Sequence, residues 1–99
     1  MPSSLRSPTD STLLQSALKG DIQALGALIE RHFGKAYAVA LARLGDPEVA
    51  EDLAQEVFLR AQLHLQQLGP RGNFPGWVVR IARNLSIDWL RRGQRASRL

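Results

Sequence analysis

The chain has 99 residues, a length that suits one domain built around a single hydrophobic core. Its apolar fraction of 44% and charged fraction of 22% are ordinary for a globular protein and argue against a disordered chain. It has no cysteine, which excludes a disulfide framework and a thiolate metal site. No apolar run resembles a signal peptide or a membrane span, so we expect a cytoplasmic protein without a membrane partner.

The net charge of +4 conceals an uneven distribution along the chain. Residues 1–70 carry six Lys or Arg against eight Asp or Glu, whereas residues 71–99 carry seven Arg against a single Asp. All seven cations are arginine, whose planar guanidinium suits paired contacts with phosphates or base edges. A basic end kept only for solubility is the alternative. This alternative suits Arg95 and Arg98 better than Arg80 and Arg83, which lie within a periodic helix.

Apolar residues recur every three or four positions through four segments, which predicts an all-α protein, a compact bundle of four helices. The expected helices span about 11–19, 22–44, 47–68 and 74–92. Residues 1–9 contain two prolines and four Ser or Thr. We expect them to be disordered, and residues 10–96 to form the domain.

Side chains suited to helix ends stand at the expected borders. Asp10 or Ser11 suits the cap of the first helix, and Asp21 suits that of the second. Residues 45–47 combine a glycine that ends a helix, an aspartate that caps the next one and a proline for its first turn. Asn73, the last residue of a short glycine-rich loop, suits the cap of the fourth helix.

Each expected helix has a stripe of residues that should face the core. These are Leu13, Leu14, Ala17 and Leu18; Leu25, Leu28, Ile29, Phe33, Ala36, Tyr37, Ala40 and Leu44; Ala50, Leu53, Ala54, Val57, Phe58, Ala61, Leu65 and Leu68; and Phe74, Trp77, Val78, Ile81, Leu85 and Trp89. Asp88 falls on the last stripe, where an unpaired carboxylate would be costly. We therefore expect a cationic partner for it, either Arg92 or Arg43.

A second face of the fourth helix is cationic. Its members are Arg80, Arg83, Asn84, Ile87 and Arg91. This face is too basic for a core and too regular for a tail. Arginine and asparagine side by side suit phosphates and base edges. The pattern predicts a nucleic-acid-reading helix held by a small helical bundle.

The third helix has a polar face made by Asp52, Gln55 and Glu56, because residues three and four apart share one side of a helix. We find no matching basic residue nearby in the sequence. These side chains could dock an arginine-rich partner, or they could form an ordinary solvated face. Spacing alone favours the solvated face.

Catalytic and metal-binding patterns are missing from the sequence. The two histidines, His32 and His64, fall on different expected helices without metal-ligand spacing, and we expect both to be surface or half-buried side chains. The glycine-rich loop at residues 69–72 lacks the Gly-Lys-Ser/Thr that follows in a phosphate-binding loop. We therefore expect no enzyme, no metal and no cofactor.

Two long motifs resemble a known family. DPEVAEDLAQEVFLRAQLHL at residues 46–65 and FPGWVVRIARNLSIDWLRR at residues 74–92 are similar to region 2 of bacterial sigma factors. The short loop between them resembles the extracytoplasmic-function (ECF) group. The resemblance covers about residues 10–96 and implies an all-helical domain of the sigma factor region 2 type.

The resemblance implies a specificity subunit of RNA polymerase, which leaves catalysis to the polymerase. In the family, the face that matches Asp52, Gln55 and Glu56 docks on the clamp coiled coil of the polymerase core, so the resemblance overturns the preference for a solvated face. It also implies that the promoter minus-ten element is held as a single-stranded non-template strand, with one base flipped into a pocket at the loop. The matching residues are Arg71, Gly72, Asn73 and Phe74 for the pocket, and Arg80, Arg83, Asn84, Ile87 and Arg91 for the helix surface. An anti-sigma factor is a further candidate partner.

The sequence departs from the family pattern in two respects, and two other functions compete with the one that the resemblance implies. Only Phe74 and Trp77 stand where housekeeping sigma factors carry several aromatics, so promoter choice should be stricter. The sequence given has no second promoter-binding domain, which fits a fragment of a longer protein better than a short form that depends on another factor. The alternatives are a small basic helical module that binds duplex DNA, and a protein-interaction bundle.

Overall fold

The computed structural model describes the backbone of residues 8–98 and the side chains of residues 8–93. All regular structure in this part of the chain is helical. The helices are α1 (Asp10–Leu18), α2 (Ile22–Leu44), α3 (Pro47–Leu68) and α4 (Phe74–Arg98). The all-α prediction is therefore confirmed, although α1 begins and ends one residue early and α4 continues beyond residue 92. The disorder expected for residues 1–9 falls mostly outside the described residues.

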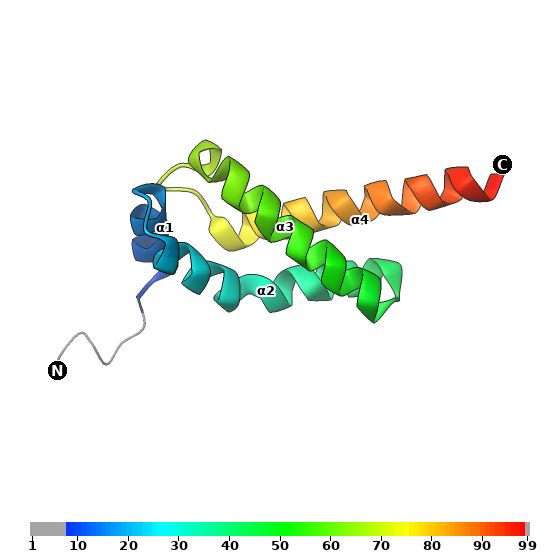
Figure 1. Ribbon diagram of the computed structural model, residues 1–99, viewed down its shortest axis with the longest axis horizontal. Coiled ribbons are helices and arrows are strands. Elements are labelled where there is room, and N and C mark those ends of the chain that lie inside the picture. Colours follow the sequence, from blue (N-terminus) through cyan, green and yellow to red (C-terminus); the bar gives the residue numbers. More distant parts are fainter. Residues whose placement is uncertain (1–7, 99) are drawn as a thin grey trace.

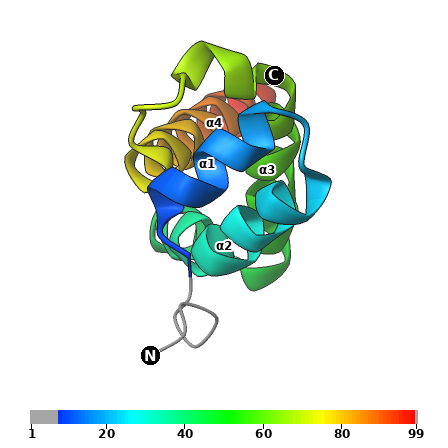
Figure 2. The same cartoon turned by 90° about the vertical axis from the view of Figure 1, so that its left-hand side faces the viewer.

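The four helices form an elongated bundle (Figure 1). Helix α2 packs against each of the other three, and α3 packs against α4. Helix α1 lies across one end of the bundle, as the end-on view shows (Figure 2). The far end of α4 projects beyond the other helices (Figure 1).

Three of the four predicted caps are confirmed. The side chains of Asp21, Asp46 and Asn73 each accept a hydrogen bond from a backbone N–H in the first turn of α2, α3 and α4, at 3.0, 3.0 and 3.1 Å. Gly45 ends α2 in the left-handed conformation, with φ of 71°. These local bonds explain why the expected borders of α2 and α3 coincide with the observed ones.

The cap expected for α1 is wrong. Thr9 caps this helix, and its hydroxyl accepts from the backbone N–H of Thr12 at 3.1 Å. Asp10 lies within the helix and turns its carboxylate toward α2. There it binds Nε2 of His32 at 2.7 Å and Nη1 of Arg31 at 3.0 Å. A tertiary contact has taken the side chain that the local sequence assigned to the cap.

His32 is buried, contrary to prediction, whereas His64 is exposed as expected. The His32 ring packs between Asp10 of α1 and the ring of Phe74 at the start of α4, with ring centroids 5.8 Å apart. Burial raises the pKa of the Asp10 carboxyl, but hydrogen bonds from Arg31 and His32 outweigh it and the pKa is lowered overall. This cluster joins three helices at one end of the bundle.

The core stripe of α4 differs from the predicted one. Phe74 and Val78 are buried as expected, but the line continues through Ala82 and Ser86, which were not expected inward. The Ser86 hydroxyl donates to the carbonyl of Ala82 at 2.8 Å, so its burial leaves no polar atom unpaired. Trp89, expected in the core, has 40% of its surface exposed.

Asp88 is exposed, and its assignment to the apolar stripe is wrong. Its predicted partner is confirmed, because Oδ2 of Asp88 lies 3.4 Å from Nη2 of Arg92. Both side chains are more than half exposed, at 58% and 62%. An ion pair this exposed contributes little to stability. The pair therefore does not fix how α4 lies on the bundle.

Candidate nucleic-acid interface

Helix α4 presents an exposed cationic face, as its periodicity predicts. Arg80, Arg83, Asn84 and Arg91 are exposed, and Ile87 is half-buried. Among the described residues, no acidic side chain forms an ion pair with these three arginines. Their guanidinium groups are therefore available for phosphates or base edges.

The loop before α4 is a compact turn that packs closely on the end of α3. Gly69 has φ of +77°, a conformation that favours glycine. A Cβ on Gly72 would overlap the Leu68 side chain and lie 2.8 Å from the Leu68 carbonyl oxygen. Gly72 is needed for close approach of the backbone, and its N–H donates to the carbonyl of Gly69 at 3.2 Å. The loop is therefore a compact turn.

The four residues expected at the base pocket differ in how far they are exposed. Arg71 and Asn73 are exposed and Gly72 is half-buried. Phe74 is only 1% exposed, and its ring packs against Trp77 with centroids 6.2 Å apart. Its ring is therefore part of the core and packs edge-to-face against Trp77.

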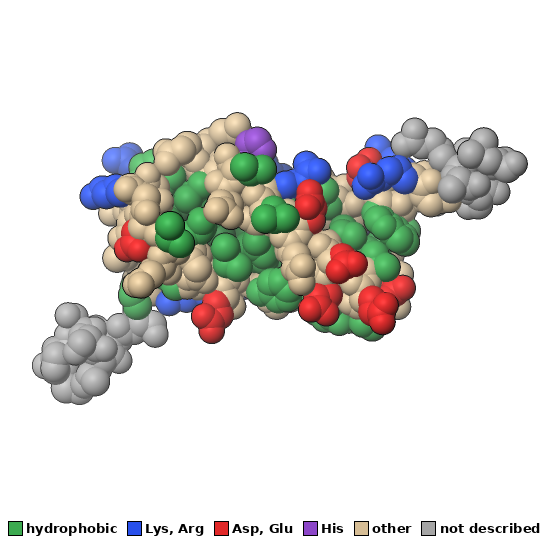
Figure 3. Space-filling view, in the orientation of Figure 1, with side chains coloured by type: hydrophobic (Ala, Val, Ile, Leu, Met, Phe, Trp, Pro, Cys, Tyr) green, Lys and Arg blue, Asp and Glu red, His purple; other side chains and the backbone are tan. Residues whose placement is uncertain are grey.

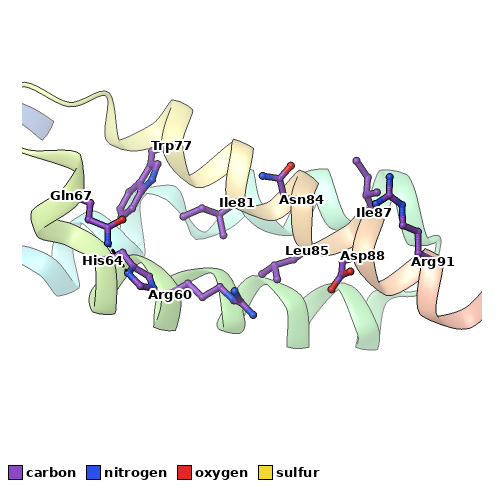
Figure 4. Close-up of a pocket in the computed structure, with 10 residues that line it drawn as sticks. All are labelled: Arg60, His64, Gln67, Trp77, Ile81, Asn84, Leu85, Ile87, Asp88 and Arg91. Carbon is purple, nitrogen blue, oxygen red and sulfur yellow. Dashed lines mark hydrogen bonds between the residues drawn. The ribbon is translucent and has the colours of Figure 1, made fainter.

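A groove of about 580 Å³ runs between α3 and α4 (Figure 4). It is lined by Arg60, His64, Gln67, Trp77, Ile81, Asn84, Leu85, Ile87, Asp88 and Arg91. The indole of Trp77 points from α4 toward His64 and Gln67 of α3 (Figure 4), whose side chains form a hydrogen bond of 3.3 Å. Asn84 and Arg91 belong to both the groove and the cationic face.

The chemistry of the groove suits a planar, polar-edged ligand. Trp77, Ile81 and Leu85 offer apolar surface on which an unstacked base can rest. The amides of Gln67 and Asn84 can donate to and accept from a base edge. Arginines at the border can hold the connecting phosphates.

Sequence reasoning missed the α3 side of this groove. Arg60, His64 and Gln67 follow one another at intervals of four and three, which places them on one side of α3. That spacing was a usable signal. Which side of α3 faces α4, however, depends on how the two helices pack.

The polar face of α3 is exposed as required for docking. Asp52 and Gln55 are exposed, and the Glu56 side chain is 46% exposed. The expectation of no basic residue nearby is wrong, because Nε of Arg60 lies 3.2 Å from Oε1 of Glu56. Further acidic side chains gather where α2 turns into α3 (Figure 3, lower right). Glu48 and Glu51, near the start of α3, are both exposed.

A second groove, of about 370 Å³, separates the acidic face of α3 from the end of α4. Its walls are Val49, Asp52, Leu53, Glu56, Arg60, Leu85, Trp89 and Arg92. Arg60 lines both grooves and pairs with Glu56. The cationic and acidic surfaces are therefore neighbours with Arg60 between them.

Comparison with known proteins decides the family. The family model described as Sigma-70 region 2 matches residues 28–96. The chain belongs to this family. The match spans α3 and most of α2 and α4, and therefore includes both grooves and both charged faces of this region 2 domain.

Curated relatives agree with this assignment. The domain is 42% identical over 78 residues to a probable RNA polymerase sigma factor, RfaY, of Xanthomonas campestris, covering 79% of this chain and 20% of that protein. It is 34% identical over 79 residues to the ECF RNA polymerase sigma factor SigW of Bacillus subtilis, covering 80% and 42%. It is 40% identical over 65 residues to the ECF RNA polymerase sigma factor SigE of Mycolicibacterium smegmatis, covering 66% and 25%.

These matches confirm the resemblance to region 2 of ECF sigma factors. The chain spans less than half the length of each of these three relatives. Within residues 8–98, no helix is long and apolar enough to cross a membrane. In the same part of the chain, no group of three or more His, Cys, Asp or Glu could hold a metal ion.

Proposed function

We propose that this region 2 domain recognises and helps to melt the minus-ten element of a promoter while it is docked on RNA polymerase. The observation that carries the proposal is the shared use of α4. Asn84, Ile87 and Arg91 belong to the cationic face and also line the groove beside Trp77. A strand held by its phosphates on this face therefore passes the mouth of a site suited to one of its bases.

The proposed DNA ligand is the single-stranded non-template strand. A base must leave the helical stack to enter the groove, at a cost of a few kcal/mol. Stacking on Trp77 and phosphate contacts from Arg80 and Arg83 offset this cost. Within the loop, Arg71 supplies a further cation, and Gly72 and Asn73 offer backbone groups to the strand. The ring of Phe74 acts from within the core, through its contact with Trp77.

The proposed polymerase contact is the clamp coiled coil of the core enzyme. Asp52, Gln55 and Glu56 supply two carboxylates and an amide on one side of α3, which suits basic side chains of a partner helix. An anti-sigma factor that covers either charged face would compete with polymerase or DNA. Under this proposal the domain supplies specificity, while synthesis of RNA belongs to the polymerase.

Duplex binding is the second candidate, and the projecting end of α4 favours it (Figure 1). A helix that projects from the bundle could enter a major groove. Fluorescence anisotropy with a single-stranded non-template oligonucleotide, its complement and the duplex separates the two candidates. We expect the tightest binding to the non-template strand and a loss on changing one base. Equal or tighter binding to the duplex would refute the single-strand proposal.

A further inference from the structure

A polar side chain, His32, is buried in the core at the end of the bundle where α4 begins. It is 5% exposed, and its Nδ1 atom has no hydrogen-bond partner among the described residues. Burying an imidazole costs free energy that an apolar side chain of similar size would not cost. Neither the DNA contacts nor the polymerase contact proposed above uses this residue. Its place in the core therefore needs another explanation.

Two charged side chains fix the orientation of the His32 ring. Oδ2 of Asp10 lies 2.7 Å from Nε2 of His32. At neutral pH the carboxylate is ionised and can only accept, so Nε2 carries the hydrogen. Asp10 is held in turn by Arg31, whose Nη1 donates to Oδ1 of Asp10 at 3.0 Å and to the carbonyl of Pro8 at 2.8 Å. A directional hydrogen bond sets the plane of the ring, which an apolar contact at this position would not do.

From His32, a series of ring contacts leads to the groove between α3 and α4. The ring centroids of His32 and Phe74 are 5.8 Å apart, and those of Phe74 and Trp77 are 6.2 Å apart. Phe74 is only 1% exposed, so its ring cannot turn without displacing its neighbours. Trp77 is half-buried and lines the groove in which we place a base (Figure 4). Helix α1, which lies across the end of the bundle (Figure 2), is thereby connected to the base site.

We propose that His32 is a positioning residue for the base site, and that α1 thereby sets how accurately this site reads a base. The inference rests on the proposed function. Asp10 holds the His32 ring, and the ring holds Phe74. Phe74 in turn holds the indole of Trp77 at the angle that a stacked base requires. Loss of the hydrogen bond from α1 lets the indole take other orientations, which weakens stacking and leaves the phosphate contacts of α4 in place.

A brace that only attaches α1 to α2 is the alternative. The same bonds would then add stability, and a variant would affect the base site only as far as it unfolds the domain. The two explanations differ in what they require of the ring contact between His32 and Phe74. His32→Gln separates them, because its amide can still donate to Asp10 while the ring is removed.

The test uses the chain with Trp89→Phe, in which Trp77 is the only tryptophan. The variants are Asp10→Ala and His32→Gln, and Asp21→Ala is the matched control. The Asp21 carboxylate also accepts two hydrogen bonds, at 3.0 and 3.2 Å, but from backbone N–H groups at the start of α2. Anisotropy gives the affinities for a single-stranded minus-ten oligonucleotide and for a copy with the preferred base replaced at one position. Their ratio cancels the general attraction to DNA, which rises when either aspartate is removed.

We expect the affinity ratio to fall about fivefold in Asp10→Ala and in His32→Gln, near the lower end of what one stacked base contributes. The fluorescence emission of Trp77, recorded without DNA, should move to longer wavelength in both variants, because a loosened indole is more exposed to water. Asp21→Ala should unfold at a lower urea concentration, since α2 loses its cap, but should keep the ratio and the emission of the parent. His32→Gln keeps the bond to Asp10, so it tests the inference even where Asp10→Ala unfolds α1.

The outcomes separate the inference from the function on which it rests. A parental ratio in His32→Gln, with a lower ratio in Asp10→Ala, would assign the cluster to holding α1 and overturn the inference. Equal losses in Asp10→Ala and Asp21→Ala would attribute the effect to general instability and overturn it as well. Failure of the proposed function gives a different result, because the parent chain would then bind both oligonucleotides equally. Unchanged Trp77 emission in both variants would overturn the positioning role even then, since this measurement needs no DNA.

Discussion

The cationic face of α4 makes a quantitative prediction about salt. The change is Arg80→Gln together with Arg83→Gln, two exposed arginines without an ion-pair partner among the described residues. If both arginines hold phosphates of a single strand, removing each one reduces the magnitude of the negative slope of log K against log salt by about 0.7. The slope of the double variant should therefore be shallower by about 1.4. Between about 50 and 200 mM salt, the difference in affinity from the parent should shrink about sevenfold.

The assay is anisotropy of a labelled single-stranded minus-ten oligonucleotide at four or more salt concentrations. The control is Lys35→Gln with Arg43→Gln, which removes the same charge from exposed positions on α2. Because a general loss of positive charge would act in both variants, only a larger effect on α4 supports direct contact. Equal slopes for the two variants would refute the assignment of Arg80 and Arg83 as phosphate contacts.

Three further predictions concern the groove, the loop and the end of the bundle. Trp77→Leu should weaken single-strand binding by about 1–3 kcal/mol through lost stacking; Trp89→Leu is the control, and equal losses in anisotropy would contradict a base site at Trp77. Gly72→Ala should lower the free energy of unfolding in urea by about 1–3 kcal/mol because its Cβ overlaps Leu68, and an unchanged midpoint would contradict the compact turn. Asp10→Asn should lower the free energy of unfolding by about 1 kcal/mol at pH 7. Since the pKa of Asp10 is lowered from 3.8, that difference should vanish as the pH falls through the folded-state pKa; a difference that persists in acid would contradict the ion-pair origin.

Local chemistry was enough to predict most of the fold. The borders of α2 and α3 follow from caps and end residues that act within one turn, such as Asp21, Gly45 and Asp46. The sequence could not show that Asp10 leaves the cap position, because its partners His32 and Arg31 lie more than twenty residues away. The burial of His32 has the same cause. Both errors arise where a tertiary contact outweighs a local preference.

The candidate site was predictable to the extent that it lies on one helix. Exposure of Arg80, Arg83 and Asn84 follows from the period of α4 alone. The groove required the relative placement of α3 and α4, which periodicity does not supply. Trp89 shows the same limit, since the core line of α4 passes through small residues instead and leaves the indole at the edge of the second groove.

The placement of charge gives a physical reason why one small domain could hold two large partners. Phosphates are attracted to α4 and repelled by the acids at the start of α3, whereas a basic clamp helix experiences the opposite forces. Electrostatic repulsion therefore keeps each partner off the other's surface, without steric exclusion. The two surfaces meet at Arg60, which pairs with Glu56 and lines both grooves. In the proposed complex, a strand on α4 and a helix on α3 would lie close together while each keeps its own charged surface.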